Sequence, residues 1–446
     1  MTDIQVPWGS GEMSITIPEH WELQQVASPA LPSAPENWSE RLAVALHKPV
    51  SGPPLDRLLA GLKGGRIAII VEDLTRHSPL DKILQVVLRE IRHAGVANEQ
   101  MEIVFASGMH PPMTPQEARE KLGSAAEDIS RRSNPWDNPD AYVSLGHFGR
   151  LEVCMDRGVV EADLRIIISS VSPHLQAGFG GGYKMLFPGC GLLRDIRLLH
   201  RIGIRRRRGG QLVGTDARTN PMRRAIDAAG VMADKNHGVT FAVQYLLDAE
   251  NQPTSLAAGP PTPTHRMLTK QCATSCGIIP TRPADVLITN AYPRDRDLWQ
   301  AFKCIPNTCW AVRPNGVLIC LARCEAGLNE MKTMRWPLSP TWTRRIVRLL
   351  GPEVICTMMD RIVTRLAGDS QWFIRLATQI LQRNPIFMVS PKLVEQNVKF
   401  PGIALFGDVD EAIAAAGKLL GGGSQRVSVW PWGGASYPYP QEDTTA

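Results

Sequence analysis

The chain has 446 residues, of which 43% are hydrophobic and 21% charged, and its formal net charge is +6. These values are typical of a globular protein with two domains of ordinary size, and they exclude a disordered chain and a short disulfide-held scaffold. The sequence has neither a run of about eighteen apolar residues nor a basic and then apolar leader, so we expect a cytoplasmic protein without a membrane span.

The first half of the chain alternates apolar strands with amphipathic helices. Strands rich in Ile and Val are predicted over 66–73, 101–107, 164–171 and 239–248. Helices are predicted over 79–95, 114–123 and 220–230. The second of these helices has a capping box, with Thr114 as N-cap and Glu117 three residues later. This alternation predicts βαβ units and a largely parallel sheet.

The second half repeats the pattern after the proline-rich segment 257–265, which predicts a hinge. Further strands are predicted over 284–291, 315–322 and 384–390. We therefore expect two α/β domains with largely parallel sheets and an active-site cleft between them. The expected division is an N-terminal domain over 1–270, a C-terminal domain over 275–398, a strand and helix over 399–423 that return to the domain body, and a flexible tail over 424–446.

Polar side chains stand at the ends of four predicted strands, where open α/β sheets bind their ligands. Each histidine alone could be a turn residue, but two of them beside an arginine supply two bases and a carboxylate clamp. In chain order these side chains are Asp73, Thr75, Arg76, His110, His174, Lys184, Gln300 and Lys303.

The stretch "GFGGGYK" ends in Lys184 and is neither a Walker A loop nor a dinucleotide fingerprint. Tyr183 stands where the second Walker glycine belongs, and Met185 stands where a hydroxyl would hold magnesium. Consecutive glycines allow positive φ angles and close approach of backbone N–H groups. The loop is therefore either a plain tight turn or, taken with Lys184, a nest for a nucleotide-like cofactor.

The run Arg205–Arg208 is the only dense basic segment. Such runs bind nucleic acid in some proteins, but no aromatic residues or nucleic-acid module accompany this one. A solvated helix end or an oligomer contact explains it as well, so we expect no nucleic-acid partner.

Four segments carry a resemblance to a known family: "DLTR", "ASGMHPPMT", "SPHLQAGFGGGYKMLFPG" and "AYPRDRDLWQAFK". They resemble the successive signatures of the nickel-dependent lactate racemase family, over about residues 15–420. The resemblance implies a racemase or epimerase of 2-hydroxyacids. It also implies a nickel-pincer nucleotide, pyridinium-3,5-bisthiocarboxylic acid mononucleotide nickel, joined covalently to Lys184 and supplied by cofactor-synthesis enzymes. The resemblance is also compatible with an oligomeric protein.

The same resemblance implies roles for individual residues, with the cofactor and acid/base residues in the N-terminal domain. His110 and His174 would be the acid/base pair, each serving one direction, and His200 would be the nickel ligand. The implied cofactor-binding residues are Asp73, Thr75, Gly180, Gly181 and Gly182, besides Lys184. The implied substrate-binding residues are Arg76, Trp299, Gln300, Lys303 and Trp372.

The chain departs from the family pattern at several of these positions. Tyr183 replaces the usual arginine before the lysine, Gly180 replaces a serine, and Pro111 replaces an arginine after the first histidine. His77 stands where a proline is more usual, and Trp299 stands where a tyrosine is common. These changes affect the expected phosphate contacts and substrate choice, while the acid/base set is complete.

The chemistry of such a reaction explains why a cofactor is expected. A histidine with a pKa near 6.5 is too weak a base to remove the C2 hydrogen as a proton, whereas removal as hydride is feasible when a cofactor accepts it. One histidine would take the hydroxyl proton as hydride leaves, and the 2-oxoacid would then receive hydride on its other face. Two alternatives stay open: a non-racemising 2-hydroxyacid oxidoreductase, and a non-catalytic protein that binds a nucleotide or hydroxyacid.

Overall fold

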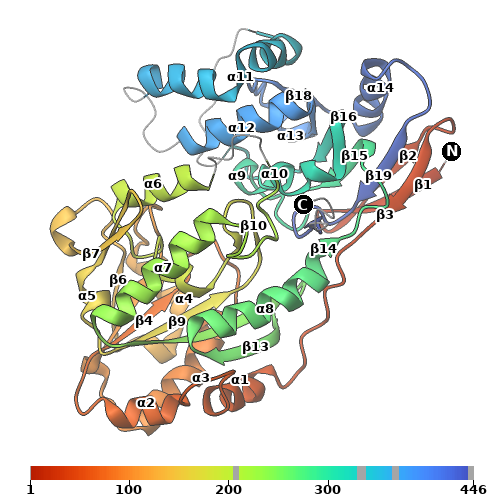
Figure 1. Ribbon diagram of the computed structural model, residues 1–446. Helices are drawn as coiled ribbons and strands as arrows, with labels where there is room; N and C mark the ends of the chain where they lie inside the picture. Colours follow the sequence, from red (N-terminus) through yellow and green to blue (C-terminus); the bar gives the residue numbers. More distant parts are fainter. Residues whose placement is uncertain (1, 204–209, 329–337, 364–370, 440–446) are drawn as a thin grey trace. The chain divides into compact units, whose positions relative to one another are not determined.

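The computed structural model describes residues 2–203, 210–328, 338–363 and 371–439. The chain divides into two compact units (Figure 1). Unit 1 consists of Met1–Ala30, Arg206–Gly214 and Cys276–Ala446, and unit 2 of Leu31–Arg205 and Thr215–Ser275. Each unit contains a six-stranded, largely parallel sheet with helices, which confirms the predicted fold class of two α/β domains. The basic run Arg205–Arg208 lies outside the described residues.

The sheet of unit 2 has the order β13-β12-β9-β4-β5-β6, and only β13 is antiparallel to its neighbour. The predicted strands of this half are confirmed. The bounds are β4 (Ile67–Val71), β5 (Met101–Phe105), β6 (Ser130–Ser133), β9 (Leu164–Ser170), β12 (Val239–Leu247) and β13 (Pro253–Gly259). Two small antiparallel pairs lie beside this sheet: β7 (Tyr142–Phe148) with β8 (Leu151–Asp156), and β10 (Pro173–His174) with β11 (Gly178–Phe179).

The helices of unit 2 cover both faces of this sheet. The α-helices are α1 (Trp38–His47), α2 (Leu55–Gly61), α3 (Leu80–His93), α4 (Pro115–Leu122), α5 (Arg157–Val160), α6 (Leu193–Ile202), α7 (Pro221–Asn236) and α8 (Pro261–Cys276). Short 3-10 turns are η1 (Asn98–Gln100), η2 (Ser124–Ala126), η3 (Pro139–Ala141) and η4 (Gly182–Met185). The Thr114–Glu117 capping box at the start of α4 is confirmed.

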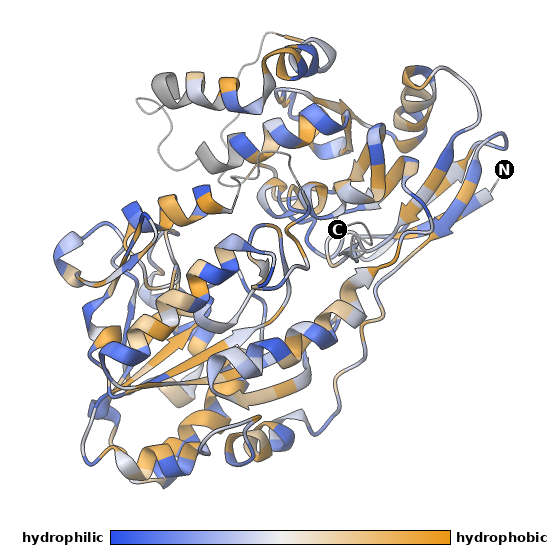
Figure 2. Cartoon of the chain, in the orientation of Figure 1, coloured by the Kyte–Doolittle hydropathy of each residue, from blue (hydrophilic) through white to orange (hydrophobic). Residues whose placement is uncertain are grey.

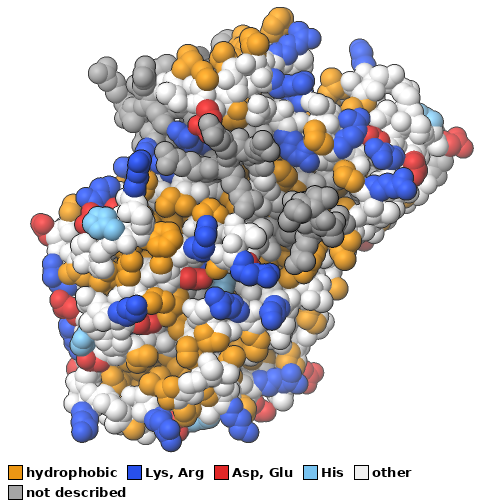
Figure 3. Space-filling view, viewed as in Figure 1, with side chains coloured by type: hydrophobic (Ala, Val, Ile, Leu, Met, Phe, Trp, Pro, Cys, Tyr) orange, Lys and Arg blue, Asp and Glu red, His pale blue; other side chains and the backbone are white. Residues whose placement is uncertain are grey.

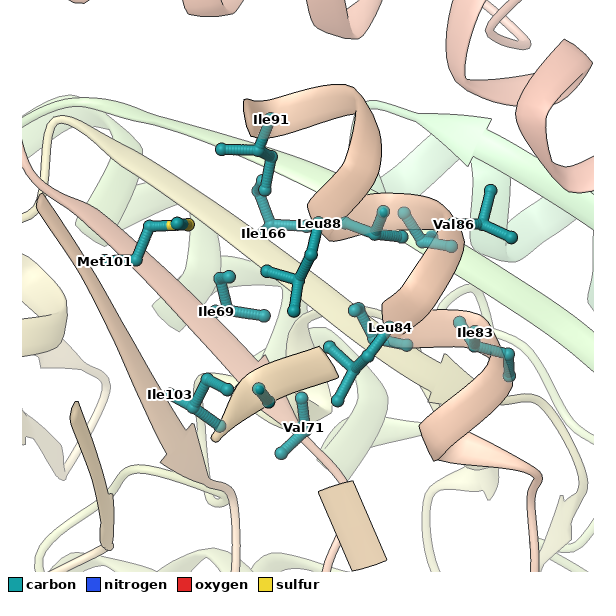
Figure 4. Close-up of a cluster of buried hydrophobic side chains, with 14 of the residues drawn as sticks. Ile69, Val71, Ile83, Leu84, Val86, Leu88, Ile91, Met101, Ile103 and Ile166 are labelled. Atoms are coloured by element: carbon teal, nitrogen blue, oxygen red, sulfur yellow. The ribbon is translucent and has the colours of Figure 1, made fainter. Parts of the chain in front are cut away.

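Alternate strand residues point to opposite faces, so one strand serves two cores. Ile69 and Val71 of β4 pack with α1–α4, and Leu84 of α3 lies over them (Figure 4). Ala68 and Ile70 pack instead with β8, α6 and α7. β4 is accordingly apolar and buried along its whole length, as expected for a strand covered on both faces, and apolar residues predominate in the central strands of this sheet (Figure 2).

Unit 1 has a fully parallel sheet of the order β18-β17-β16-β15-β19-β3. Its strands, with two small pairings, are β1 (Thr2–Trp8), β2 (Gly11–Ile17), β3 (Glu22–Val26), β14 (Gly277–Ile278), β15 (Ala284–Asn290), β16 (Val312–Leu321), β17 (Ile386–Val389), β18 (Ile403–Phe406), β19 (Arg426–Trp430) and β20 (Tyr437–Pro438). Its helices are α9 (Leu298–Ala301), α10 (Cys304–Thr308), η5 (Cys309–Ala311), α11 (Pro340–Val363), α12 (Gln371–Arg383), α13 (Pro391–Glu395) and α14 (Val409–Leu419).

The division of the chain differs from the expected one at both ends. The first thirty residues belong to unit 1 and not to an N-terminal domain over 1–270, because β3 pairs with β19 and the β1–β2 hairpin packs on β15 and β16. The expected flexible tail over 424–446 is wrong for its first part. There β19 is an interior strand of the sheet, with Val427, Val429 and Trp430 buried.

Two further expectations concern the middle of the chain. The proline-rich segment 257–265 is not a hinge: it contains the end of β13 and the first turn of α8, where Pro261 and Pro263 are tolerated because that turn needs no N–H donors. The strand and helix predicted over 399–423 are β18 and α14, and β18 pairs with β17 inside unit 1.

The surface of the molecule carries charge of both signs. Basic side chains are spread over the face in view, with acidic ones among them (Figure 3). Among the described residues, no helix is long and apolar enough to cross a membrane.

Replacing Trp430 by alanine tests the structural role of β19. Its side chain is fully buried in unit 1, so Trp430→Ala should lower the free energy of unfolding by ~3–5 kcal/mol, as large cavities do. The matched control is Trp342→Ala, at a position that is 57% exposed on α11, which should cost less than about 1 kcal/mol. Urea denaturation followed by circular dichroism measures both, and equal effects would contradict the assignment.

Candidate active site

The strand order of unit 2 places a topological switch point between β4 and β9. From β4 the chain proceeds to β5 and β6 on one side of the sheet, whereas β9 and β12 lie on the other. Connections that depart in opposite directions leave a crevice at the carboxyl ends of the two central strands. Glu72–Arg76 follow β4, His110 follows β5, and the segment with His174 and Lys184 follows β9.

His110 is paired with a carboxylate. Its Nδ1 lies 2.6 Å from Oδ2 of Asp73. Burial opposes ionisation of Asp73, but the hydrogen bonds from His110 and Thr75 and the charge of Arg76 outweigh it and hold the pKa of Asp73 well below its usual range. Because Asp73 is ionised it must accept, so Nδ1 of His110 donates, and in the neutral ring the lone pair is then on Nε2. His110 is therefore built as a base with its ring oriented by Asp73.

Nδ1 of His174 accepts hydrogen bonds, whereas Nδ1 of His110 donates one. Its Nδ1 accepts hydrogen bonds from the backbone N–H groups of Gln176 (3.3 Å) and Ala177 (3.1 Å). Burial, together with the charges of Lys184 and Arg76, holds its pKa well below the usual value. The ring is therefore neutral, and because Nδ1 accepts, the proton is on Nε2. The site thus offers a lone pair at His110 and an N–H donor at His174.

Lys184 lies on η4 with its amine in a cationic environment. Burial first, then the charges of Arg76 and Arg223, lower its pKa to about 7, although Asp73 and Glu72 act in the other direction. Neither the amine of Lys184 nor the guanidinium of Arg76 has a hydrogen bond or ion pair with another described side chain. At neutral pH a substantial fraction of the Lys184 amine is unprotonated and nucleophilic.

His200 has the hydrogen-bonding pattern of a metal ligand. It lies in the last turn of α6, where Nδ1 donates to the carbonyl of Ile196 at 3.0 Å, one turn earlier. This donation leaves the lone pair on Nε2, as in histidines that bind metals. Burial and the charge of Lys184 lower its pKa to about 4, so the ring is neutral. Within the described ranges, no group of three or more His, Cys, Asp or Glu residues could hold a metal ion, so protein ligands alone do not build a metal site there.

The predicted cofactor-binding residues fall into two groups. Oδ1 of Asp73 accepts from the N–H (3.0 Å) and hydroxyl (2.5 Å) of Thr75, so these two side chains orient each other and His110. Gly181 and Gly182 have φ angles of +76° and +65°. Gly180 has no such requirement, and a Cβ there would make only ordinary contacts, with Ser172 at 3.7 Å and Ser170 at 4.0 Å, so the family's serine would also fit.

Sequence reasoning missed residues that tie these loops together. The carboxylate of Glu72 accepts from the N–H and hydroxyl of Ser170 (2.7 and 2.6 Å) and from the hydroxyl of Ser78 (2.7 Å), which links the ends of β4 and β9 to α3. The side-chain amide of Asn134 donates to the carbonyls of Gly108 and Gly191 (2.9 and 3.0 Å). The only signal in the sequence was an acid directly after five apolar residues, at Glu72.

The remaining predicted site residues belong to unit 1 and follow the carboxyl end of β15. Asp297 caps α9 by accepting from the N–H of Gln300 at 2.9 Å. Nζ of Lys303 donates to Oε1 of Gln300 at 2.8 Å, so the structure brings these two together. Trp299 lies beside Gln300 on α9. The side chain of Trp372 lies outside the described part of α12.

The low pKa of Lys184 is measurable in the protein without any cofactor. Modification by an amine-acylating reagent at a series of pH values, followed by peptide mass spectrometry, should give a midpoint for Lys184 near pH 7, because only the neutral amine reacts. An ordinary lysine has a pKa of about 10.4, and exposed Lys82 is the internal reference. A Lys184 midpoint as high as that of Lys82 would contradict this electrostatic description.

Comparison with known proteins identifies the family of this chain. Residues 8–210 match the family model of the lactate racemase N-terminal domain, and residues 279–436 match that of the lactate racemase C-terminal domain. A lactate racemase of Thermoanaerobacterium thermosaccharolyticum is 26% identical over 451 residues, covering 97% of this chain and 98% of that protein. A lactate racemase of Lactiplantibacillus plantarum is 26% identical over 299 residues, covering 65% and 66% of the two chains.

Solved structures show a similar fold. The lactate racemase apoprotein of T. thermosaccharolyticum has a TM-score of 0.79 at 23% identity, and the match covers 99% of this chain and 100% of that chain. A protein of Thermotoga maritima has a TM-score of 0.62 at 16% identity, covering 91% and 98%. Because the two family models together span most of the sequence, the chain belongs to the lactate racemase family, a family of isomerases.

Proposed function

We propose that this protein inverts the C2 centre of a 2-hydroxyacid and that it uses a nickel-pincer nucleotide joined covalently to Lys184. The observation that carries the proposal is the set of complementary groups in the segments that follow β4, β5 and β9. These are a partly neutral amine at Lys184, a guanidinium at Arg76 that has no partner among the described side chains, a base at His110 and an N–H donor at His174. This set is what proton-coupled removal of hydride from a bound 2-hydroxyacid requires.

The residues present fit such a group. The Lys184 amine has no competing partner among the described side chains, so a covalent link breaks no ion pair. The His200 ring is neutral and carries its lone pair on Nε2. The hydroxyl of Ser107, at the end of β5, is buried without a hydrogen-bond partner among the described residues, which is costly unless a ligand supplies one. Lys184 would hold the nucleotide covalently and His200 would bind its nickel.

The protein's own side chains would then handle the substrate and its proton. When bound, the nucleotide supplies an acceptor for hydride. Arg76 binds the carboxylate, and Nε2 of His110 takes the hydroxyl proton, while Asp73 stabilises the imidazolium that results. His174 donates its Nε2–H to substrate oxygen from its own side. Gln300 and Lys303 are proposed to assist substrate binding, as the family resemblance implies.

Attachment at Lys184 is tested by intact mass. Protein co-expressed with the cofactor-synthesis enzymes and then denatured should retain a covalent adduct with bound nickel, because a thioamide survives unfolding. The variant Lys184→Ala should retain none, whereas the control Lys82→Ala should retain it fully. Adduct in Lys184→Ala would place the attachment elsewhere. A wild-type protein that never carries it would favour a cofactor-free binding protein.

The acid/base assignment is tested on a panel of 2-hydroxyacids that includes dicarboxylic and sugar acids. His110→Ala and His174→Ala should each lower the rate of C2 inversion by roughly 10²–10⁴, the usual contribution of such a group. Asp73→Asn should also lower it, because an amide does not fix the His110 ring by charge, while exposed His237→Ala should not. Chiral chromatography measures the rate. Inversion that is intact in both histidine variants contradicts the assignment, and release of 2-oxoacid instead of the epimer would indicate an oxidoreductase.

A further inference from the structure

The glycine loop, residues 177–182, is held from its buried side by an arginine of α7. Arg223 is 2% exposed. Its Nε and Nη1 donate to the carbonyls of Ala177 and Gly181, both at 3.3 Å, and its Nη2 donates to the carbonyl of Phe179. Its nearest carboxylate is Asp227, at 3.7 Å. One planar guanidinium therefore binds three carbonyls of the same loop, which its rigid fork of donors allows.

A histidine of α8 completes this set. Nε2 of His265 lies 2.8 Å from the carbonyl of Gly180, and since a carbonyl only accepts, Nε2 donates. Burial and the charge of Arg223 hold the pKa of His265 well below its usual value, so the ring is neutral. The ring also packs directly on the loop, because a Cβ added at Gly182 would stand 3.1 Å from it. Four loop carbonyls are thus bound by two buried side chains.

The orientation of these carbonyls decides where the N–H groups of the loop point. In a planar trans peptide the carbonyl and the following N–H point in opposite directions. The carbonyls of Gly180 and Gly181 face His265 and Arg223, so the N–H groups of Gly181 and Gly182 face away from them. Neither N–H has an acceptor among the described residues. The loop therefore turns its carbonyls to the interior of unit 2 and its donors to the opposite side.

We infer that Arg223 and His265 are positioning residues, which hold the glycine loop in one conformation and thereby set where His174 and Lys184 stand at its two ends. A run of glycines needs such support, because it has no side chains of its own to pack and loses the most conformational entropy on folding. The functional part of this inference rests on the proposed function, since it concerns the residues that would bind substrate and cofactor.

Arg223 has a second effect through its charge. It is one of the cations that lower the pKa of both Lys184 and His174, after burial itself. Titration of Lys184 therefore measures this effect of charge separately from turnover and from loop exchange.

Matched pairs of variants test the inference. His265→Gln keeps an N–H donor for Gly180, and His265→Leu removes it. Arg223→Lys keeps the positive charge but loses the planar set of N–H donors, and Arg223→Gln removes both the charge and that set of donors. The controls are Arg224→Gln, on the exposed face of the same helix, and exposed His237→Gln. Thermal unfolding first shows which variants fold, and hydrogen exchange of the glycine-loop peptide then measures how far each loosens the loop.

We expect His265→Leu to lower kcat about 10²-fold, as misplaced reacting groups do, with a smaller change in KM. In His265→Gln, kcat should recover to within several-fold of the wild-type value. In the apoprotein, Arg223→Gln should raise the acylation midpoint of Lys184 by about one pH unit, a tenfold change, and Arg223→Lys should raise it less. Loop exchange should be faster in His265→Leu and Arg223→Gln.

The inference is overturned if His265→Leu turns over at the wild-type rate, or if His265→Gln and His265→Leu lose activity equally. An unchanged Lys184 midpoint in Arg223→Gln also overturns it. These failures differ from failure of the proposed function, in which the wild-type protein carries no adduct and inverts no 2-hydroxyacid. The acylation and exchange measurements need no cofactor, so they decide the positioning role in that case too.

Discussion

The parallel pairing of β4 with both β5 and β9 is the constraint on which the site depends. The chain leaves β4 in one direction along the sheet and returns to β9 on the other side, so the loops after these two strands diverge around a common crevice. Glu72 secures this point, because its buried carboxylate accepts from Ser170 at the end of β9 and from Ser78 before α3. A buried carboxylate is stable only when hydrogen-bonded in this way. His110, His174 and Lys184 are placed by loops that start at these anchored ends.

The electrostatics of the crevice follow from the concentration of cations there. Arg76, Lys184 and Arg223 lie close enough for their charges to lower the pKa of neighbouring groups, and burial acts in the same direction. Neutral imidazoles and a partly neutral amine are the consequence. Asp73 is the exception, because it is ionised by its bonds to His110 and Thr75. Such a site favours an anionic ligand, since carboxylate or phosphate would offset the clustered positive charge.

Tyr183 shows how a departure from the family pattern is accommodated. Its hydroxyl donates to Asp234 at 2.5 Å, and Asp234 also pairs with the fully buried Arg165. Its ring lies against Gly230 of α7, where a Cβ would come within 2.0 Å of the ring. Position 183 is therefore part of the core in this chain. Lys184, the next residue, is on the side of the crevice.

The sequence by itself determined the elements and most of the reactive side chains. Apolar runs of Ile and Val identified β4, β5, β9 and β12, and the Thr114–Glu117 capping box identified the start of α4, because these signals are local. The rule for strand ends then selected His110, His174 and Lys184. The first thirty residues and β19 were misassigned because their strands are completed by partners about 400 residues away, β3 with β19.

Only the tertiary structure decided what these side chains do to one another. It paired Asp73 with His110, set opposite tautomers on the two histidines, and brought Arg223 and His265 behind the glycine loop. None of these contacts has a signature in the sequence, because each joins segments that are distant along the chain. Hydrogen-bond geometry and local charge depend on distances in space, and folding alone establishes those distances.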